Sequence, residues 1–131
     1  MNYGYGYRQK RSKYGAKKVH VDGMTFDSQA EYNRWLQLKQ MQREGKIAGL
    51  DRQVKYELIR EHREPDTIGP RGGRRKGKVI EPARYYVADF VYYDAETAQL
   101  VVEDTKGFRT PEYKLKKALM LDRYGIRIKE T

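Results

Sequence analysis

Asp89 is the residue whose type and position point most directly to chemistry. It lies in the middle of residues 85–93, where every other side chain is aliphatic or aromatic. A carboxylate buried in such a segment is costly unless it is paired, protonated or bound to a metal ion. The sequence therefore assigns Asp89 a chemical role in preference to a packing role.

A second acidic residue and a lysine follow on the next apolar segment. Residues 101–106 have the sequence Val-Val-Glu-Asp-Thr-Lys. Alternation along a strand places Asp104 and Lys106 on one face and Glu103 on the other. A β-bulge would exchange the two acidic residues, so Glu103 stays open as an alternative to Asp104.

The two acidic segments are close in the sequence, with a turn expected at residues 94–97, so Asp89 and Asp104 can converge at one end of a sheet. Carboxylates that close repel each other unless a cation lies between them. Mg²⁺ suits such a site, with Mn²⁺ as an alternative, because it takes one or two protein carboxylates and leaves positions for water and phosphate oxygens. Lys106 would orient the attacking water and stabilise charge on a scissile phosphate. The pattern predicts phosphodiester hydrolysis with one or two metal ions.

The overall charge favours nucleic acid as the partner. Lys and Arg number 28 against 18 Asp and Glu, a net charge of +10 over 131 residues, and this suits a polyanion. The chain has no cysteine and two separated histidines, which disfavours a zinc site. No apolar run approaches the ~20 residues of a membrane span and the first residues do not resemble a signal peptide. We therefore expect a cytoplasmic protein without a membrane partner.

The elements that position these residues begin after residues 1–18, a basic segment rich in Tyr and Gly that we expect to be a flexible tail. The rest, 19–131, is expected to be one domain. Asp22-Gly23 predicts a hairpin turn over residues 19–26. Ser28 and Glu31 have the spacing of a capping box, which predicts a helix that ends near Glu44.

Three strands, a helix and a final strand are expected to follow. The strands are predicted over 53–59, 85–93 and 99–106, the helix from Thr110-Pro111 to about Tyr124, and the last strand over 126–128. Residues 60–84 contain a basic run and are predicted to form a long mobile loop or an extended hairpin tip. Gln53 opens its strand either facing the site or in solvent. The fold class is α/β, a mixed central sheet flanked by helices.

Asp89, a short gap and then Asp104-Thr105-Lys106 resemble the signature of the PD-(D/E)XK nuclease superfamily, with Ala88 in place of the name-giving proline. This resemblance implies a restriction-endonuclease-like core in the order helix, three strands, helix, strand. In many members a glutamate on the first helix completes the metal site. Glu31 matches that glutamate in its place along the chain.

Over residues 13–124 the chain is more closely similar to small phage-encoded endonucleases of this superfamily. The matching segments are 13–15, 17–18, 21–23, 26–28 with Glu31, 88–90 and 103–107. Within the superfamily, small basic single-domain proteins resemble Holliday junction resolvases. This resemblance implies a homodimer that cuts branched or four-way DNA, acting in the host cell if it is phage-encoded. A nicking or end-cutting endonuclease of the same fold, and a non-catalytic DNA-binding module, stay open as alternatives.

Two further groups of residues are candidates for DNA binding. One group lies in the basic run of the segment 60–84, where glycines let the backbone approach phosphates. The other lies on the second predicted helix, directly after the Lys106 strand. The candidates are Arg71, Arg74, Arg75, Lys76 and Lys78 in the first group, and Tyr113, Lys114, Lys116 and Lys117 in the second.

Overall fold

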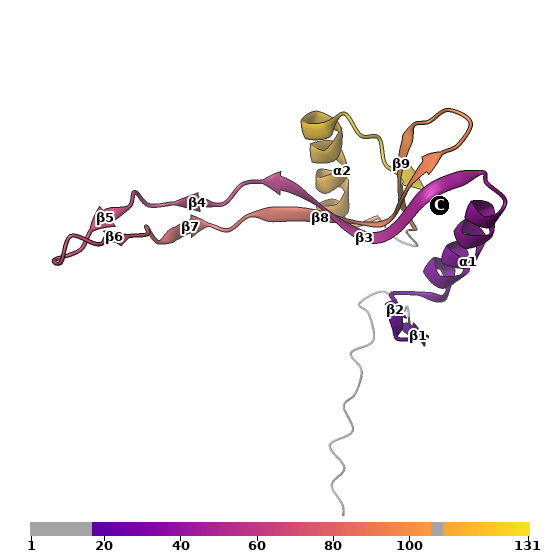
Figure 1. The fold of residues 1–131 in the computed structure, drawn as a ribbon, viewed down its shortest axis with the longest axis horizontal. Helices are drawn as coiled ribbons and strands as arrows, with labels where there is room; N and C mark the ends of the chain where they lie inside the picture. Colours follow the sequence, from indigo (N-terminus) through magenta and orange to yellow (C-terminus); the bar gives the residue numbers. More distant parts are fainter. Residues whose placement is uncertain (1–16, 106–108) are drawn as a thin grey trace, which may run out of the picture.

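A computed structural model describes residues 17–105 and 109–131 of the chain. The predicted tail lies outside these residues except for its last two, and Lys106 lies outside them as well. The helices and strands follow one another as shown in Figure 1. In chain order they are β1 (Val19–Val21), β2 (Met24–Phe26), α1 (Gln29–Arg43), β3 (Ile47–Ile59), β4 (His62–Arg63), β5 (Thr67–Ile68), β6 (Arg74–Arg75), β7 (Val79–Glu81), β8 (Arg84–Asp94), β9 (Leu100–Asp104), α2 (Pro111–Tyr124) and β10 (Lys129–Glu130).

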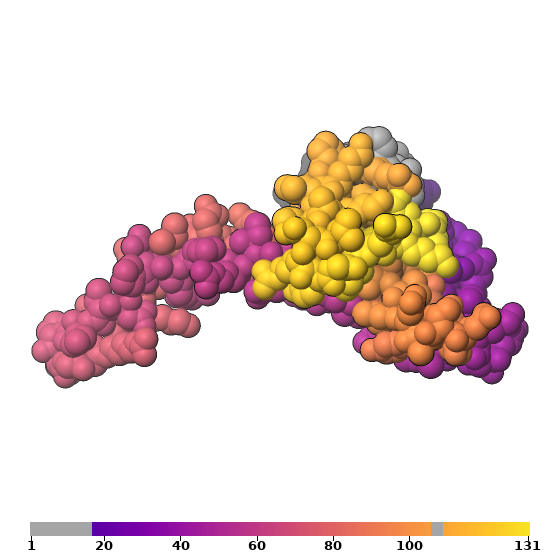
Figure 2. Space-filling model, turned by 90° about the horizontal axis from the view of Figure 1, so that it is seen from above, coloured from indigo at the N-terminus to yellow at the C-terminus, as the bar shows by residue number. Residues whose placement is uncertain are grey.

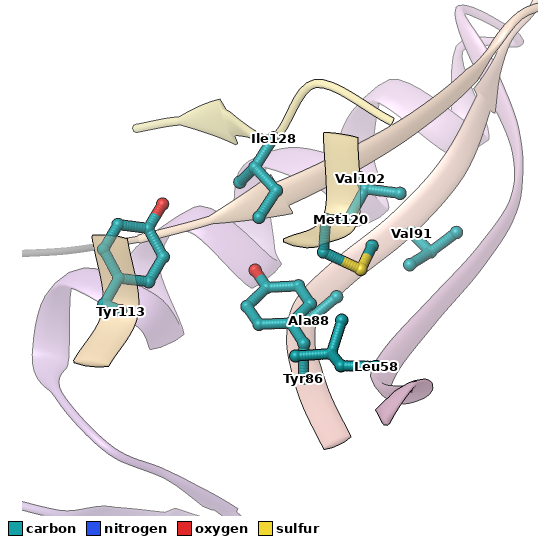
Figure 3. Packing of buried hydrophobic residues seen from close by; sticks show 8 residues of the cluster. All are labelled: Leu58, Tyr86, Ala88, Val91, Val102, Tyr113, Met120 and Ile128. Atoms are coloured by element: carbon teal, nitrogen blue, oxygen red, sulfur yellow. The ribbon is translucent and has the colours of Figure 1, made fainter. Parts of the chain in front are cut away.

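The body of the molecule is a mixed sheet between two helices, so the predicted α/β class is confirmed. Among the described residues its strand order is β10-β9-β8-β3. Strands β3, β8 and β9 are antiparallel neighbours, whereas β10 runs parallel to β9. Val101 packs with the cluster that contains Leu38 of α1, and Val102 with the cluster that contains Met120 of α2. Because neighbouring strand residues point to opposite faces, each helix covers its own face of the sheet, and Figure 3 shows the α2-side cluster.

Local signals in the sequence set the ends of both helices as predicted. Ser28 is the N-cap of α1 and accepts a hydrogen bond from the backbone N–H of Glu31 at 3.1 Å. Thr110 caps α2 in the same way, with Pro111 in its first turn. Gly125 ends α2 with a φ of 66°, a left-handed conformation that glycine adopts at low cost.

The two predicted tight turns are also confirmed. Asp22 and Gly23 join β1 to β2 with φ values of 49° and 75°, as a two-residue hairpin turn requires. Between β8 and β9, the carboxylate of Asp94 accepts hydrogen bonds from the backbone N–H groups of Glu96 and Thr97 at 2.9 and 3.1 Å. This short connection places β9 directly beside β8.

Two predicted strand boundaries are wrong. Strand β3 starts at Ile47 instead of residue 53, because a register shift near Gly49 lets the pairing with β8 continue past that point. The last strand was predicted over 126–128, but β10 comprises Lys129–Glu130. Ile128 is buried in the α2-side cluster, and Ile126 packs against it. The parallel pairing with β9 therefore begins only at Lys129.

Residues 60–84 form an extended hairpin, the second of the two predicted alternatives. We call this segment the arm. Its two sides pair as β4 with β7 and as β5 with β6. The arm continues the line of β3 and β8 away from the body, as Figures 1 and 2 show.

The alternation of side chains reverses at one level of the sheet. Ala88 packs on the α2 side whereas Phe90 packs on the α1 side, although a regular strand would place both on one face. The registered pairs Arg52–Phe90 and Val54–Ala88 place Gln53 opposite Asp89 at this level. Gln53 has a φ of 56°, and such a left-handed residue rotates the strand that follows it. The reversal thus occurs at Asp89.

Within residues 17–105 and 109–131, neither α1 nor α2 has the length and apolar character of a bilayer-crossing helix.

Candidate active site

Three carboxylates from three separate elements come together in the interior. Glu31 lies in the first turn of α1, Asp89 in the middle of β8 and Asp104 at the end of β9. Their exposed fractions are 2%, 7% and 0%. The backbone N–H of Thr105, next to Asp104, donates to Asp89 Oδ2 at 2.8 Å, which ties the middle of β8 to the end of β9. The structure thus gathers the three carboxylates that the sequence analysis selected.

Asp89 is the carboxylate most affected by its surroundings. Burial raises its pKa to about 8, and the negative charges of Asp104 and then Glu31 act in the same direction. The hydrogen bond from the Thr105 N–H opposes the rise but does not cancel it. Asp89 therefore holds its proton near neutral pH unless a positive charge stabilises the ionised form.

Glu31 is held by groups from two elements. Its Oε2 accepts from the backbone N–H of Asp27 and its Oε1 from the side-chain amide of Gln53, both at 3.3 Å. Arg52 Nη2 lies 3.9 Å from Oε1. Burial raises the pKa of Glu31, the charge of Asp27 adds to this, and Arg52 opposes it. The carboxylate is thus fixed in position without complete charge compensation.

Tyr86 orients Asp104. Its buried hydroxyl donates to Asp104 Oδ2 at 2.6 Å. Burial, together with this hydrogen bond and the charge of Asp104, raises the pKa of Tyr86 above its ordinary value. The hydroxyl therefore stays protonated and acts only as a donor toward Asp104.

Glu103 belongs to a separate network on the α1 side. Arg34 donates to both of its carboxylate oxygens, with Nη2 3.1 Å from Oε2, and Tyr92 donates its hydroxyl to Oε2 at 2.6 Å. Burial alone raises the pKa of Glu103, but the bonds from Arg34 and Tyr92 outweigh it, and the pKa lies below the ordinary value. Glu103 therefore behaves as a buried ion-pair partner, and Asp104 is the one that joins Asp89.

Most of the chain matches the model of a known protein family. Residues 11–130 match DUF1064, whose description is a protein of unknown function. The chain belongs to the DUF1064 family. No curated protein and no solved structure matches it. The match spans all three carboxylates and the arm but assigns no activity to the DUF1064 chain.

Of the remaining predicted site residues of the DUF1064 chain, one lies outside the described residues, and those on α2 differ in their contacts. Lys106, the lysine of the proposed signature, lies outside the described residues. On α2, the side chains of Tyr113 and Lys117 both donate to Glu130 Oε1, at 3.1 and 2.5 Å, and Lys116 pairs with Glu112 at 3.2 Å. Lys114 has no ion pair with any residue that the structure describes.

Four residues around the carboxylates gain importance only from the structure. They are Arg34, Arg52, Gln53 and Tyr86. The sequence analysis left open whether Gln53 faces the site or solvent. Its contact with Glu31 shows that its amide faces the site. No signal in the sequence marks Tyr86, because a tyrosine in an apolar strand is usually a packing residue.

The donor set of the DUF1064 chain suits a hard divalent cation. All three side chains offer carboxylate oxygens, the ligands that Mg²⁺ and Mn²⁺ prefer. Within the described residues, no three or more His, Cys, Asp and Glu side chains form a group ready to hold a metal ion. Mg²⁺ needs only one or two protein carboxylates, since water fills its other positions. The mutual repulsion that raises the pKa of Asp89 is what such a cation would relieve.

Proposed function

We propose that the chain is a metal-dependent DNA endonuclease whose hydrolytic site comprises Glu31, Asp89, Asp104 and Lys106. The observation that carries this proposal is the buried group of three carboxylates. Burial and two neighbouring negative charges raise the pKa of Asp89 to about 8. Carboxylates whose pKa is raised by burial and by neighbouring negative charges cluster at binding and catalytic sites.

Asp89 and Asp104 would hold the metal ion, with Glu31 completing the set. When bound, Mg²⁺ or Mn²⁺ supplies an activated water and neutralises charge on the phosphate. The protein contributes fixed orientation. The Thr105 N–H holds Asp89 and the Tyr86 hydroxyl holds Asp104, so little reorganisation is needed when substrate arrives.

Lys106 would orient the attacking water and stabilise the negative charge that develops on the phosphate. Its place in the chain, two residues after Asp104, supports this role.

We propose the restriction-endonuclease-like core as the fold of this site. In support, α1, β3, β8, β9, α2 and β10 follow one another as helix, three strands, helix and strand, if the short strands of the arm and the first hairpin are set aside. The three proposed carboxylates lie on the first helix and on the second and third of these strands, as the sequence resemblance implies.

Branched DNA, in particular a four-way junction, is the proposed substrate. The net charge of +10 supports binding to phosphates in preference to reading of bases. A homodimer would present two such sites to opposed strands, and a two-fold protein suits a two-fold junction.

The decisive experiment measures cleavage of a synthetic four-way junction in Mg²⁺ or Mn²⁺, beside a linear duplex and a splayed fork. Asp89→Asn should abolish cleavage. Asp122→Asn, which makes the same change on the exposed surface of α2, should leave it intact. The affinity for Mn²⁺, measured by calorimetry, should fall in Asp89→Asn but not in Asp122→Asn.

Each outcome separates the candidate functions. Paired symmetric nicks on the junction alone establish a resolvase. Cleavage of all three substrates keeps the endonuclease and removes the junction preference, which then favours a nicking or end-cutting enzyme. DNA binding without cleavage in either metal, with Asp89→Asn indistinguishable from wild type, refutes the nuclease proposal and leaves a DNA-binding module.

A further inference from the structure

The arm is a two-stranded ribbon with hardly any buried surface of its own. Apart from Gly69, Gly77 and Ala83, all of its residues are exposed, and Ile68 is 80% exposed. A two-stranded hairpin alone is marginally stable in water. Either the arm has strong internal bonds or its stability depends on a partner that covers it.

Polar contacts hold the arm in a defined shape. The backbone N–H of Glu64 donates to Lys78 O at 2.8 Å. Asp66 accepts from Arg74 Nε at 2.7 Å and from the backbone N–H of Gly77 at 2.9 Å. A Cβ atom on Gly77 would lie 1.7 Å from the carbonyl oxygen of Glu64, so the close approach of the two sides requires glycine there. These contacts give the arm a preformed structure.

The positive charge of the arm gathers at its far end. The arm has eight basic and four acidic residues, and the acidic side chains that form ion pairs neutralise bases within it: Glu61 pairs with Arg63, Asp66 with Arg74 and Glu81 with Arg84. The side chains of the other basic residues at and near the tip form no ion pair or hydrogen bond with any described residue. They are Arg71, Arg75, Lys76 and Lys78.

We propose that the arm lies along the double-stranded DNA that flanks the reaction site. A two-stranded ribbon fits the major groove, which is about 12 Å wide. Residues 60–68 in an extended conformation reach about 30 Å at roughly 3.3 Å per residue, close to the 34–36 Å of about one helical turn of DNA. The four basic side chains without ion pairs, at and near the tip, then contact phosphates at a distance from the carboxylates.

This inference rests on the proposed function only in taking DNA as the partner, and it adds a duplex flank of about one turn to the substrate. The charge argues against a second copy of the chain as the partner. If the arms of two copies packed together, their tips would lie side by side. Each tip has an excess of positive charge, so the two tips would repel each other. DNA phosphates supply the charge that complements the tip.

The test compares two variants that each lose four positive charges. The arm variant carries Arg71→Gln, Arg75→Gln, Lys76→Gln and Lys78→Gln. The matched control carries the same type of change at four exposed basic positions on the body. These control positions are Arg43, Lys46, Arg127 and Lys129.

Binding to a duplex is measured by fluorescence anisotropy with EDTA present, so that cleavage plays no part. Over a range from about 50 to about 300 mM NaCl, the slope of log K against log salt should become less negative by about 3 to 4 in the arm variant, and by less than about 1 in the control. At about 150 mM NaCl, affinity should fall at least tenfold in the arm variant alone. A hydroxyl-radical footprint should lose about 10 base pairs of protection on one flank.

Equal losses in the two variants would overturn the proposal, because they would show only a general effect of charge. An unchanged salt slope with a changed oligomeric state, measured by sedimentation, would also overturn it and assign the arm to contacts between copies. The result is independent of catalysis: an inactive protein whose arm variant alone shows the altered slope supports the arm and refutes the nuclease.

Discussion

Asp89→Asn is expected to stabilise the metal-free protein at neutral and alkaline pH. The pKa of Asp89 rises from an ordinary value of 3.8 to about 8 in the folded protein. Between these values the unfolded chain gives up the proton while the folded chain keeps it, so the free energy of unfolding decreases as pH rises from about 4 to about 8. Asparagine has no proton to lose, and this pH-dependent loss should disappear.

The structure sets the size of the effect. One pKa unit corresponds to about 1.4 kcal/mol, so a shift of about four units gives an upper limit of about 6 kcal/mol. Because Asp104 and Glu31 share the repulsion and side chains relax, we expect a gain of about 2–3 kcal/mol at about pH 8. The Thr105 N–H, 2.8 Å from Asp89 Oδ2, would still find an acceptor oxygen in asparagine.

The assay is urea denaturation in EDTA at about pH 5 and about pH 8, repeated with Mg²⁺. The variant should exceed wild type in stability at the higher pH and differ little at the lower one. Added Mg²⁺ should stabilise wild type and leave the variant nearly unchanged, because a ligand stabilises the state that binds it.

Glu103→Gln is the matched control, for which we expect the opposite change in the free energy of unfolding. The pKa of Glu103 is lowered by Arg34 and Tyr92 despite its burial, so its ionised form stabilises the fold above about pH 4.5 and this stability is lost as pH falls. Glu103→Gln should therefore destabilise the protein by about 2–4 kcal/mol at about pH 8. If Asp89→Asn also proves less stable than wild type there, the account of the buried carboxylates is refuted.

Substitutions at three further positions each test a single feature of the structure. Arg34→Met leaves Glu103 buried without its cation and should cost about 2–4 kcal/mol in urea denaturation; a loss below about 0.5 kcal/mol would count against a structural role. Tyr86→Phe removes the 2.6 Å hydrogen bond to Asp104 and should cost about 1–3 kcal/mol, with an unchanged far-ultraviolet circular dichroism spectrum. Gln53 has a φ of 56°, so Gln53→Val should have a free energy of unfolding about 1–3 kcal/mol lower than Gln53→Gly in urea denaturation. Equal stability of the two variants would show that the left-handed conformation carries no strain.

Much of the candidate site followed from residue types, because burying a carboxylate is costly wherever the chain places it. Asp89 was conspicuous for that reason, and Asp104 followed from the alternation of β9. The choice of Asp104 over Glu103 depended on regular alternation. It agrees with the contacts of Arg34 with Glu103 and of Tyr86 with Asp104.

The reversal of the sheet faces at Asp89 was not predictable. It depends on a single left-handed residue, Gln53, and glutamine has no strong preference for that conformation. The arm was predicted only as one of two alternatives, because its exposed polar residues suit a loop as well as a ribbon. Its shape depends on contacts such as that of Asp66 with Gly77 across the hairpin.

The sequence by itself determined the features that depend on neighbours along the chain. The turn at Asp22-Gly23 and the caps at Ser28, Thr110 and Gly125 each involve bonds or dihedral angles within a few residues. Tertiary structure alone decided the pairing of Arg34 with Glu103, 69 positions apart, and the convergence of the carboxylates of α1, β8 and β9. Such contacts form only when the whole sheet closes, since many chain segments offer an arginine or a carboxylate and only global packing selects among them.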